Sequence, residues 1–120
     1  MADYIIYHNP NCGTSRNALE LLRERGIEPQ IVEYLKTPPD DATLLALAKR
    51  MGQPLWHLLR EKDPLCAELG LAPGACSEAE LARTMERHPV LINRPIVSGP
   101  LGVRLCRPLE LAQEILPPTD

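Results

Sequence analysis

The residue best suited to chemistry is Cys12, in the segment HNPNCGTS at residues 8–15. A short apolar run precedes this segment and a stretch with helical periodicity follows it, so we expect Cys12 to lie where a strand ends and a helix begins. At such a place, free backbone N–H groups and the positive end of the helix dipole stabilise a thiolate. An ordinary cysteine is only about 3% ionised at pH 7, so this environment predicts a nucleophilic cysteine.

Three neighbours of Cys12 are further candidates. His8 is a catalytic candidate because a protonated imidazole would add a positive charge near the sulfur, although a loop histidine with a structural role has the same pattern. Asn9 and Ser15 are secondary candidates, which could contact a ligand or only shape the loop and cap the helix. Ser15 stands where a dithiol oxidoreductase has its second cysteine, so the motif C-x-x-S predicts regeneration by an external thiol. The tyrosine-phosphatase motif C-x5-R is excluded, because its arginine position is Ala18.

The other three cysteines fit a structural role. Their spacing contains no C-x2-C or C-x4-C pair, so the sequence predicts no metal site. No secretory signal is recognisable, and we expect a cytoplasmic protein with reduced thiols. Cys66, Cys76 and Cys106 are therefore expected to be small, partly buried apolar residues, unless one of them lies near Cys12 and can form a disulfide with it.

Arginine makes up most of the positive charge. Ten of the 13 basic residues are arginine, whose planar guanidinium binds oxyanions in a bidentate manner, although codon bias would give the same excess. The net charge of −3 provides no general attraction for nucleic acid, so an anionic ligand would have to be bound locally. No apolar run approaches the roughly 20 residues needed to span a membrane.

The elements around Cys12 are expected to form a strand-helix-strand unit. The apolar run at residues 4–7 and the β-rich run at residues 30–34 read as strands. Between them a helix should begin near Thr14 or Ser15 and end at Gly26. The connection from residue 8 to residue 29, which contains this helix, is long enough for a crossover and implies that the two strands are parallel.

The rest of the chain is expected to be helical and then β-rich. Helices are expected at 40–51, 54–60, 77–88 and from 108 onwards. Each begins with residues typical of helix N-termini, namely proline, aspartate or a Ser-Glu pair. The β-like runs lie at 90–92, 95–97 and 103–105, with a turn at 98–102. Together these patterns predict one α/β domain over residues 1–120, with a mixed sheet, helices on its faces and a helical insertion at about 40–88.

Four motifs in one order are similar to those of a known family: YHNPNCGTSR (7–16), LLR (58–60), HPVLINRPIV (88–97) and LCRP (105–108). They resemble the ArsC family, the glutaredoxin-dependent arsenate reductases, over roughly residues 3–116. The resemblance implies a thioredoxin-like fold with a helical insertion, Cys12 as nucleophile and His8 as the residue that helps to ionise it. It also implies a cis peptide bond before Pro95. The arginines that would hold the oxyanion and the arsenic intermediates are Arg60, Arg94 and Arg107.

The resemblance also implies a reaction. Cys12 would attack arsenate with loss of water, glutathione would add as co-substrate, and glutaredoxin would take the glutathione so that arsenic leaves as the trivalent acid. The enzyme would be a cytoplasmic monomer with no bound cofactor, no nucleic-acid partner and no membrane association. Charge-assisted hydrogen bonds of about 1.5–3 kcal/mol from each arginine would offset the repulsion between thiolate and oxyanion. Phosphate, which has the same shape and charge, is then expected to compete with arsenate.

Two other functions remain open at this point. One is a related thioredoxin-fold oxidoreductase that uses Cys12 on glutathione or its mixed disulfides and does not act on arsenate. The other is a regulator of the same fold that binds RNA polymerase, but such a regulator usually carries a C-x-x-C switch, which Ser15 interrupts. A pure binding protein would also have no use for the three arginines.

Overall fold

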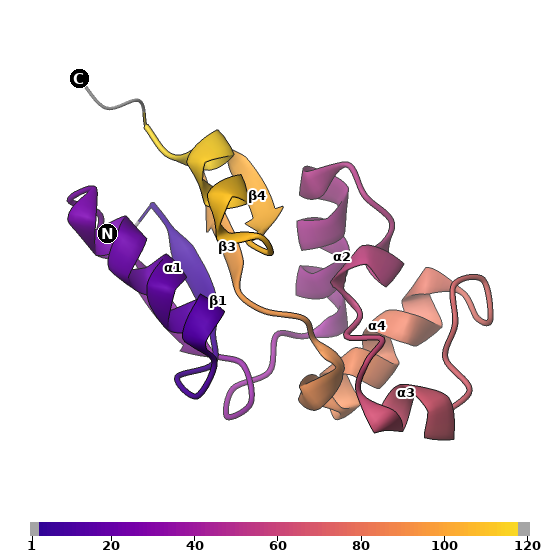
Figure 1. Cartoon of the computed structure of the whole chain (residues 1–120). Coiled ribbons are helices and arrows are strands. Elements are labelled where there is room, and N and C mark those ends of the chain that lie inside the picture. The colour runs from indigo at the N-terminus through magenta and orange to yellow at the C-terminus, as the bar shows by residue number, and fades with distance from the viewer. Residues whose placement is uncertain (1–2, 118–120) are drawn as a thin grey trace. The chain divides into compact units, whose positions relative to one another are not determined.

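A computed structural model of the chain describes residues 3–117. Their contacts form two compact units, one made of the residues up to 37 together with those from 94 onwards, and one made of residues 38–93. The first unit contains a four-stranded sheet, and the second is built of helices (Figure 1). Cys12 belongs to the sheet unit.

The sheet has the strand order β2-β1-β3-β4. Its strands are β1 (Ile5–His8), β2 (Gln30–Glu33), β3 (Ile96–Gly99) and β4 (Gly102–Leu105). β1 and β2 are parallel, with Ile5 opposite Gln30, which confirms the predicted crossover. β1 pairs with β3, and β3 with β4, in antiparallel orientation. The sheet is therefore mixed, as predicted, and a hairpin joins its last two strands.

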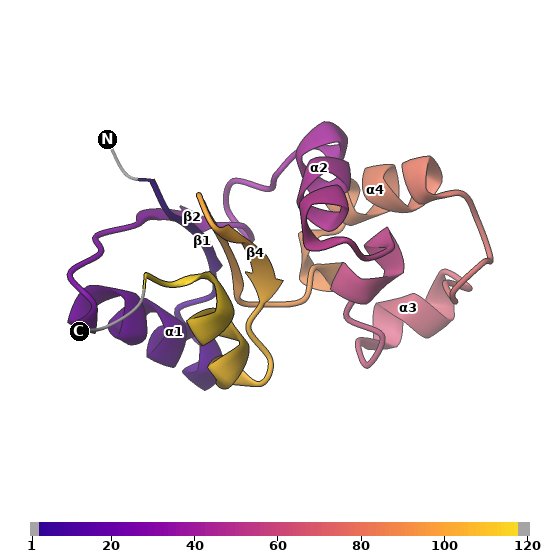
Figure 2. The same ribbon diagram turned by 90° about the horizontal axis from the view of Figure 1, so that it is seen from above.

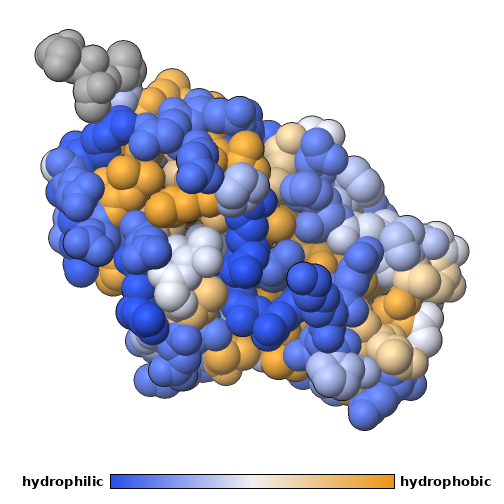
Figure 3. All heavy atoms as spheres, in the orientation of Figure 1, coloured by the Kyte–Doolittle hydropathy of each residue, from blue (hydrophilic) through white to orange (hydrophobic). Residues whose placement is uncertain are grey.

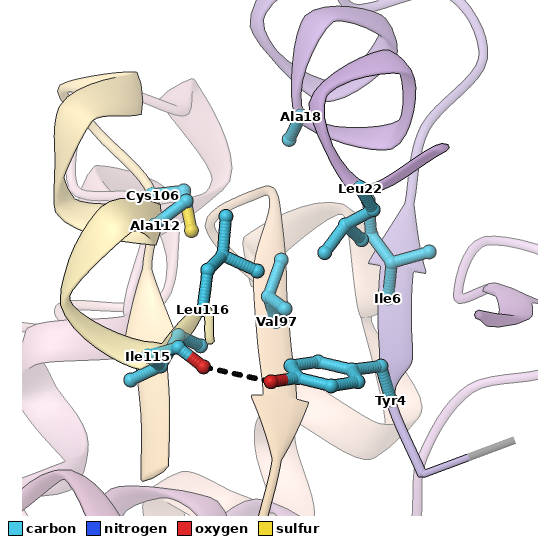
Figure 4. Packing of buried hydrophobic residues seen from close by; sticks show 9 residues of the cluster. All are labelled: Tyr4, Ile6, Ala18, Leu22, Val97, Cys106, Ala112, Ile115 and Leu116. Carbon is cyan, nitrogen blue, oxygen red and sulfur yellow. Dashed lines mark hydrogen bonds between the residues drawn. The ribbon is translucent and has the colours of Figure 1, made fainter. Parts of the chain in front are cut away.

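Two helical segments cover one face of this sheet, α1 (Gly13–Glu24) and the 3-10 helix η3 (Leu109–Ile115). They lie side by side in both ribbon views (Figures 1 and 2). The core beneath them consists of Tyr4, Ile6, Ala18, Leu22, Val97, Cys106, Ala112, Ile115 and Leu116 (Figure 4). The buried Tyr4 hydroxyl donates a 2.9 Å hydrogen bond to the carbonyl of Ile115, so the end of η3 is fixed to the residue that precedes β1.

The second unit contains α2 (Asp41–Met51), η1 (Leu55–Leu58), α3 (Pro64–Glu68), α4 (Glu78–Arg87) and η2 (Pro89–Leu91). Asp40 caps α2 by accepting from the Thr43 N–H, and Gly52 ends this helix in the left-handed conformation. The Ser77 hydroxyl accepts from the Glu80 N–H at the start of α4. These are the caps that the sequence predicts.

The apolar run at 90–92 is not a strand, contrary to the prediction. Pro89 has a fixed φ and no N–H, and Pro89–Leu91 turns as a 3-10 helix instead. Only Ile92 forms a β contact, an isolated bridge to Leu59.

Several predicted helices also differ in their ends or type. α1 begins at Gly13, and Cys12 itself is the N-cap, not Thr14 or Ser15. The segments that follow Pro54 and Pro108 are 3-10 helices. α3 has only five residues, too few to produce a periodic pattern in the sequence.

Hydrophilic residues predominate on the face of the molecule seen in Figure 3, and smaller hydrophobic areas lie between them. The exposed large hydrophobic residues are dispersed along the chain: Ile31, Leu35, Leu69, Val90 and Leu101. Within residues 3–117, none of the helices has the length and apolarity needed to cross a membrane.

Candidate functional site

One edge of the sheet collects the chain segments that carry predicted site residues. β1 and β3 are antiparallel with Tyr7 opposite Ile96, so the end of β1 lies beside the start of β3. Ile96 is also opposite Leu105, at the end of β4. The segments that carry Cys12, Arg94 and Arg107 are therefore connected to the sheet at the same edge.

Cys12 is the N-cap of α1. Its backbone is extended, with φ −101° and ψ 122°, and its N–H donates to the Asn9 carbonyl at 3.0 Å. Its carbonyl accepts the N–H of Arg16 at 3.0 Å, as the first helical hydrogen bond. The first turn of α1 contains no acidic residue, so the positive end of the helix dipole is not neutralised and faces the partly exposed sulfur.

The surroundings of Cys12 favour its ionised form. Burial of the sulfur raises its pKa, but the backbone N–H of Ser15 and the guanidinium groups of Arg94 and Arg107 outweigh this effect, and the pKa of the Cys12 thiol lies below its ordinary value. A thiolate is a stronger acceptor than a thiol, so these donors stabilise the ionised form more than the neutral one. The prediction of an activated cysteine at a helix N-terminus agrees with this geometry.

Arg107 connects the sulfur to the backbone of the neighbouring loop. Its Nη1 lies 3.8 Å from the Cys12 Sγ and donates a 3.0 Å hydrogen bond to the Arg94 carbonyl. Both of these contacts use Nη1. Nε and Nη2 of this exposed side chain have the geometry to bind an oxyanion in a bidentate manner. The Arg94–Pro95 peptide bond is cis, as the resemblance implies, and so is Arg107–Pro108.

His8 does not supply the positive charge that the sequence led us to expect. Burial of its ring lowers its pKa; the Glu33 carboxylate opposes this effect, and the cations Arg16 and Arg23 add to it. A pKa below the ordinary imidazole value favours the neutral form of His8 at pH 7.

The hydrogen bond of His8 leads to Ser15. The His8 Nδ1 and the Ser15 Oγ share a 2.6 Å hydrogen bond, and Oγ also accepts the N–H of Asn9 at 3.0 Å. Ser15 is fully buried and His8 is 6% exposed. Ser15 thus joins the end of β1, the loop and the first turn of the helix that carries Cys12.

Asn9 has a structural place in the same loop. Its side-chain Oδ1 accepts the N–H of Asn11 at 2.9 Å, and its carbonyl accepts that of Cys12. These bonds form a compact turn in front of the helix. The structure therefore gives Asn9 the loop-shaping role that the sequence left open beside ligand contact.

Arg60 lies in the helical unit, just beyond η1. Leu59 separates Arg60 from the end of η1. The Arg60 N–H donates to the Leu91 carbonyl at 2.7 Å, and its carbonyl accepts from the Cys66 thiol at 3.4 Å. The backbone of Arg60 is thus fixed within its own unit. Its role as an oxyanion ligand stays a prediction.

The remaining cysteines differ strongly from Cys12. All four cysteines are free. Cys106 is fully buried in the core, and its burial raises its pKa to about 12. Cys66 is buried, and its pKa is raised by that burial and by Asp63 and Glu61. Cys76 is partly exposed. Within residues 3–117, no three potential metal ligands of the His, Cys, Asp or Glu type come together.

Arg16, which the sequence does not single out, also contacts the loop before Cys12. The Arg16 Nη1 donates a 2.9 Å hydrogen bond to the carbonyl of Pro10 in the loop before Cys12. The sequence indicates this contact only weakly: Arg16 follows Cys12 by four residues, which places the two on the same side of the helix.

Comparison with known proteins agrees with this architecture. The model of the ArsC family matches residues 7–115. An arsenate reductase of Rhizobium meliloti (strain 1021) is 54% identical over 114 residues, which are 95% of this chain and 81% of that protein. One of Escherichia coli (strain K12) is 51% identical over 117 residues, covering 98% and 83%. The solved structure of an arsenate reductase from Vibrio cholerae superposes with a TM-score of 0.90 at 40% identity and covers 97% of this chain and 100% of that one.

The agreement extends from sequence to fold. The mixed sheet, with its strand-helix-strand unit and following hairpin, is thioredoxin-like, as the resemblance implies. The match to the family model includes every predicted site residue, from His8 to Arg107. The chain belongs to the ArsC family.

Proposed function

We propose that this protein reduces arsenate to arsenite, with Cys12 as the nucleophile. The observation that carries the proposal is the 3.8 Å approach of the Arg107 Nη1 to the Cys12 Sγ, at a helix N-terminus without acidic residues. A cation at this point stabilises a thiolate and can then bind the incoming oxyanion. The relatives that share half of their residues with this chain and are named arsenate reductases support the same substrate.

The first step is attack by sulfur on pentavalent arsenic. Arsenate is an anion at neutral pH, and the thiolate would repel it without nearby cations. Arg94 and Arg107 supply such cations from the sheet unit, and we assign Arg60 as the third. A sulfur–arsenic bond forms as one arsenate oxygen takes up protons and leaves as water, and the oxidation state of arsenic does not change.

The electrons come from thiols outside the chain. Glutathione bonds to arsenic through its sulfur and displaces a second water. A glutaredoxin thiolate then attacks the glutathione sulfur, a disulfide forms, and the electron pair of the broken sulfur–arsenic bond stays on arsenic, which becomes trivalent. Water releases arsenite and returns Cys12 to its thiol form. The protein needs no bound cofactor for this sequence.

The state of the other cysteines supports an external reductant. A resolving thiol attacks as its thiolate, and the raised pKa values and burial of Cys106 and Cys66 disfavour that form. Ser15 occupies the motif position where an internal resolving cysteine would lie. Glutathione and glutaredoxin belong to the reducing cytoplasm, so we place the reaction there, with the protein acting as a monomer.

A coupled assay with systematic omissions tests the proposal. Protein, arsenate, glutathione, glutaredoxin and glutathione reductase are mixed, and the oxidation of NADPH is followed. We expect oxidation only when all components are present. Absence of arsenate-dependent oxidation, with turnover of a glutathione mixed disulfide instead, would contradict arsenate as substrate and identify a glutathione-linked oxidoreductase.

Phosphate tests the role of the arginines in the same assay. It has the shape and charge of arsenate, so guanidinium groups that hold the oxyanion should bind it as well. We expect competitive inhibition, with a higher apparent KM for arsenate and an unchanged kcat. An apparent KM that phosphate does not alter would contradict oxyanion binding at this site.

A further inference from the structure

Arg16 contacts the loop before Cys12 from the exposed side of α1. Its Nη1 donates a 2.9 Å hydrogen bond to the Pro10 carbonyl, and its backbone N–H donates to the Cys12 carbonyl. A Cβ placed on Gly13 would lie 3.8 Å from the Arg16 Nη2, so the guanidinium runs beside the backbone of Gly13. The side chain therefore spans the turn that presents the sulfur.

This position of the charge does not benefit the helix itself. Arg16 is the fourth residue of α1, where a cation meets the positive end of the helix dipole. The first turn has no acidic residue that could pair with it. Arg23, in the last turn of the same helix, has the favourable position and pairs with Glu28 at 3.1 Å. The placement of Arg16 is explained better by the carbonyl that it holds.

Ser15 holds the same loop from the buried side. Its Oγ accepts the N–H of Asn9, and the turn between is closed by the N–H groups of Asn11 and Cys12, which donate to Asn9. The loop is thus fixed from inside by Ser15 and from outside by Arg16. Loss of either contact should loosen the turn that sets the position of the sulfur.

We propose that Arg16 is a positioning residue, which holds the Pro10 carbonyl and thereby fixes the sulfur of Cys12 for attack. The inference rests on the proposed function only in naming arsenate as the molecule attacked. Arg16 acts through the loop and does not contact the oxyanion. Removing one hydrogen bond of this kind changes an equilibrium about fivefold, and we expect effects of that size.

The test compares Arg16→Met with Arg23→Met. Both variants remove one cation from the same helix, but the Arg23 guanidinium pairs with Glu28 instead of the loop. We expect hydrogen exchange of the Cys12 and Asn11 amides to accelerate about fivefold in Arg16→Met and to stay within twofold of wild type in Arg23→Met. In the arsenate assay, kcat should fall about fivefold in Arg16→Met only, with KM within twofold of wild type.

Three results would overturn the inference. If the Cys12 and Asn11 amides exchange no faster in Arg16→Met than in Arg23→Met, the carbonyl contact does not hold the loop. A raised KM with unchanged kcat would place Arg16 on the substrate. Faster exchange throughout the sheet, or failure of Arg16→Met to fold, would give it a general structural role. The exchange measurement needs no arsenate, so it stays decisive if the protein proves to have another substrate.

Discussion

Replacing Arg107 by glutamine should make Cys12 a weaker acid. The Arg107 Nη1 lies 3.8 Å from the sulfur, and two unit charges at that separation interact by about 1 kcal/mol in water. The water value applies because Arg107 is exposed, and salt reduces it further. Since 1.36 kcal/mol corresponds to a tenfold change, the acid dissociation constant of the Cys12 thiol should fall about fivefold at low salt.

The assay is the pH dependence of iodoacetamide alkylation, with the Cys12 peptide identified by mass spectrometry so that Cys76 does not contribute. The thiolate is the reacting form, so removing the cation should move the profile to higher pH. Arg104→Gln is the matched control, because Arg104 pairs with Glu114 at 2.8 Å and has no contact with the sulfur in the structure. The control should react like wild type. An unchanged profile in Arg107→Gln, or a shift to lower pH, would refute the electrostatic argument.

Three further predictions concern stability. Ser15→Ala should lower the free energy of unfolding in urea by about 1–3 kcal/mol, because the buried ring of His8 and the N–H of Asn9 lose their partner; a loss below about 0.5 kcal/mol would contradict this role. Gly99→Ala should cost about 1–3 kcal/mol, because a Cβ there would overlap the ring of Tyr4, and an unchanged urea midpoint would show that the ring can move aside. The free energy of unfolding should fall as the pH is lowered from about 7 to 5, because His8 binds a proton more readily in the unfolded chain than when it is buried. His8→Gln should make the free energy of unfolding depend less on pH. An equal pH dependence in both proteins would assign the effect to other groups.

Local signals in the sequence predict the elements on either side of Cys12 well. The apolar run, the polar loop and the helical periodicity place a strand, a loop and a helix correctly, and the caps at Asp40 and Ser77 are where their side-chain chemistry puts them. The run at 90–92 differs from the prediction because a short apolar segment has the same composition in a strand and in a buried turn. The N-cap of α1 could not be predicted from residue type, because cysteine is not a usual capping residue.

Contacts between distant residues could not be read from the sequence. The registers that bring the end of β1, the start of β3 and the end of β4 to one edge depend on pairing across the chain. The neutrality of His8 depends on its burial, and the place of Arg107 beside Cys12 depends on a partner 95 residues away. Arg16 is an exposed residue, and only the fold shows that its side chain contacts the Pro10 carbonyl.

The most direct test of the account is the formation of arsenite itself, measured by chromatographic separation of the two arsenic species in the complete glutathione and glutaredoxin mixture. Wild type and Cys76→Ser should form arsenite at similar rates, because Cys76 takes no part in the proposed reaction. Cys12→Ser should form none above the rate without protein, because a serine hydroxyl cannot provide the sulfur–arsenic bond. Arsenite production that persists in Cys12→Ser would contradict the assignment of Cys12 as the nucleophile.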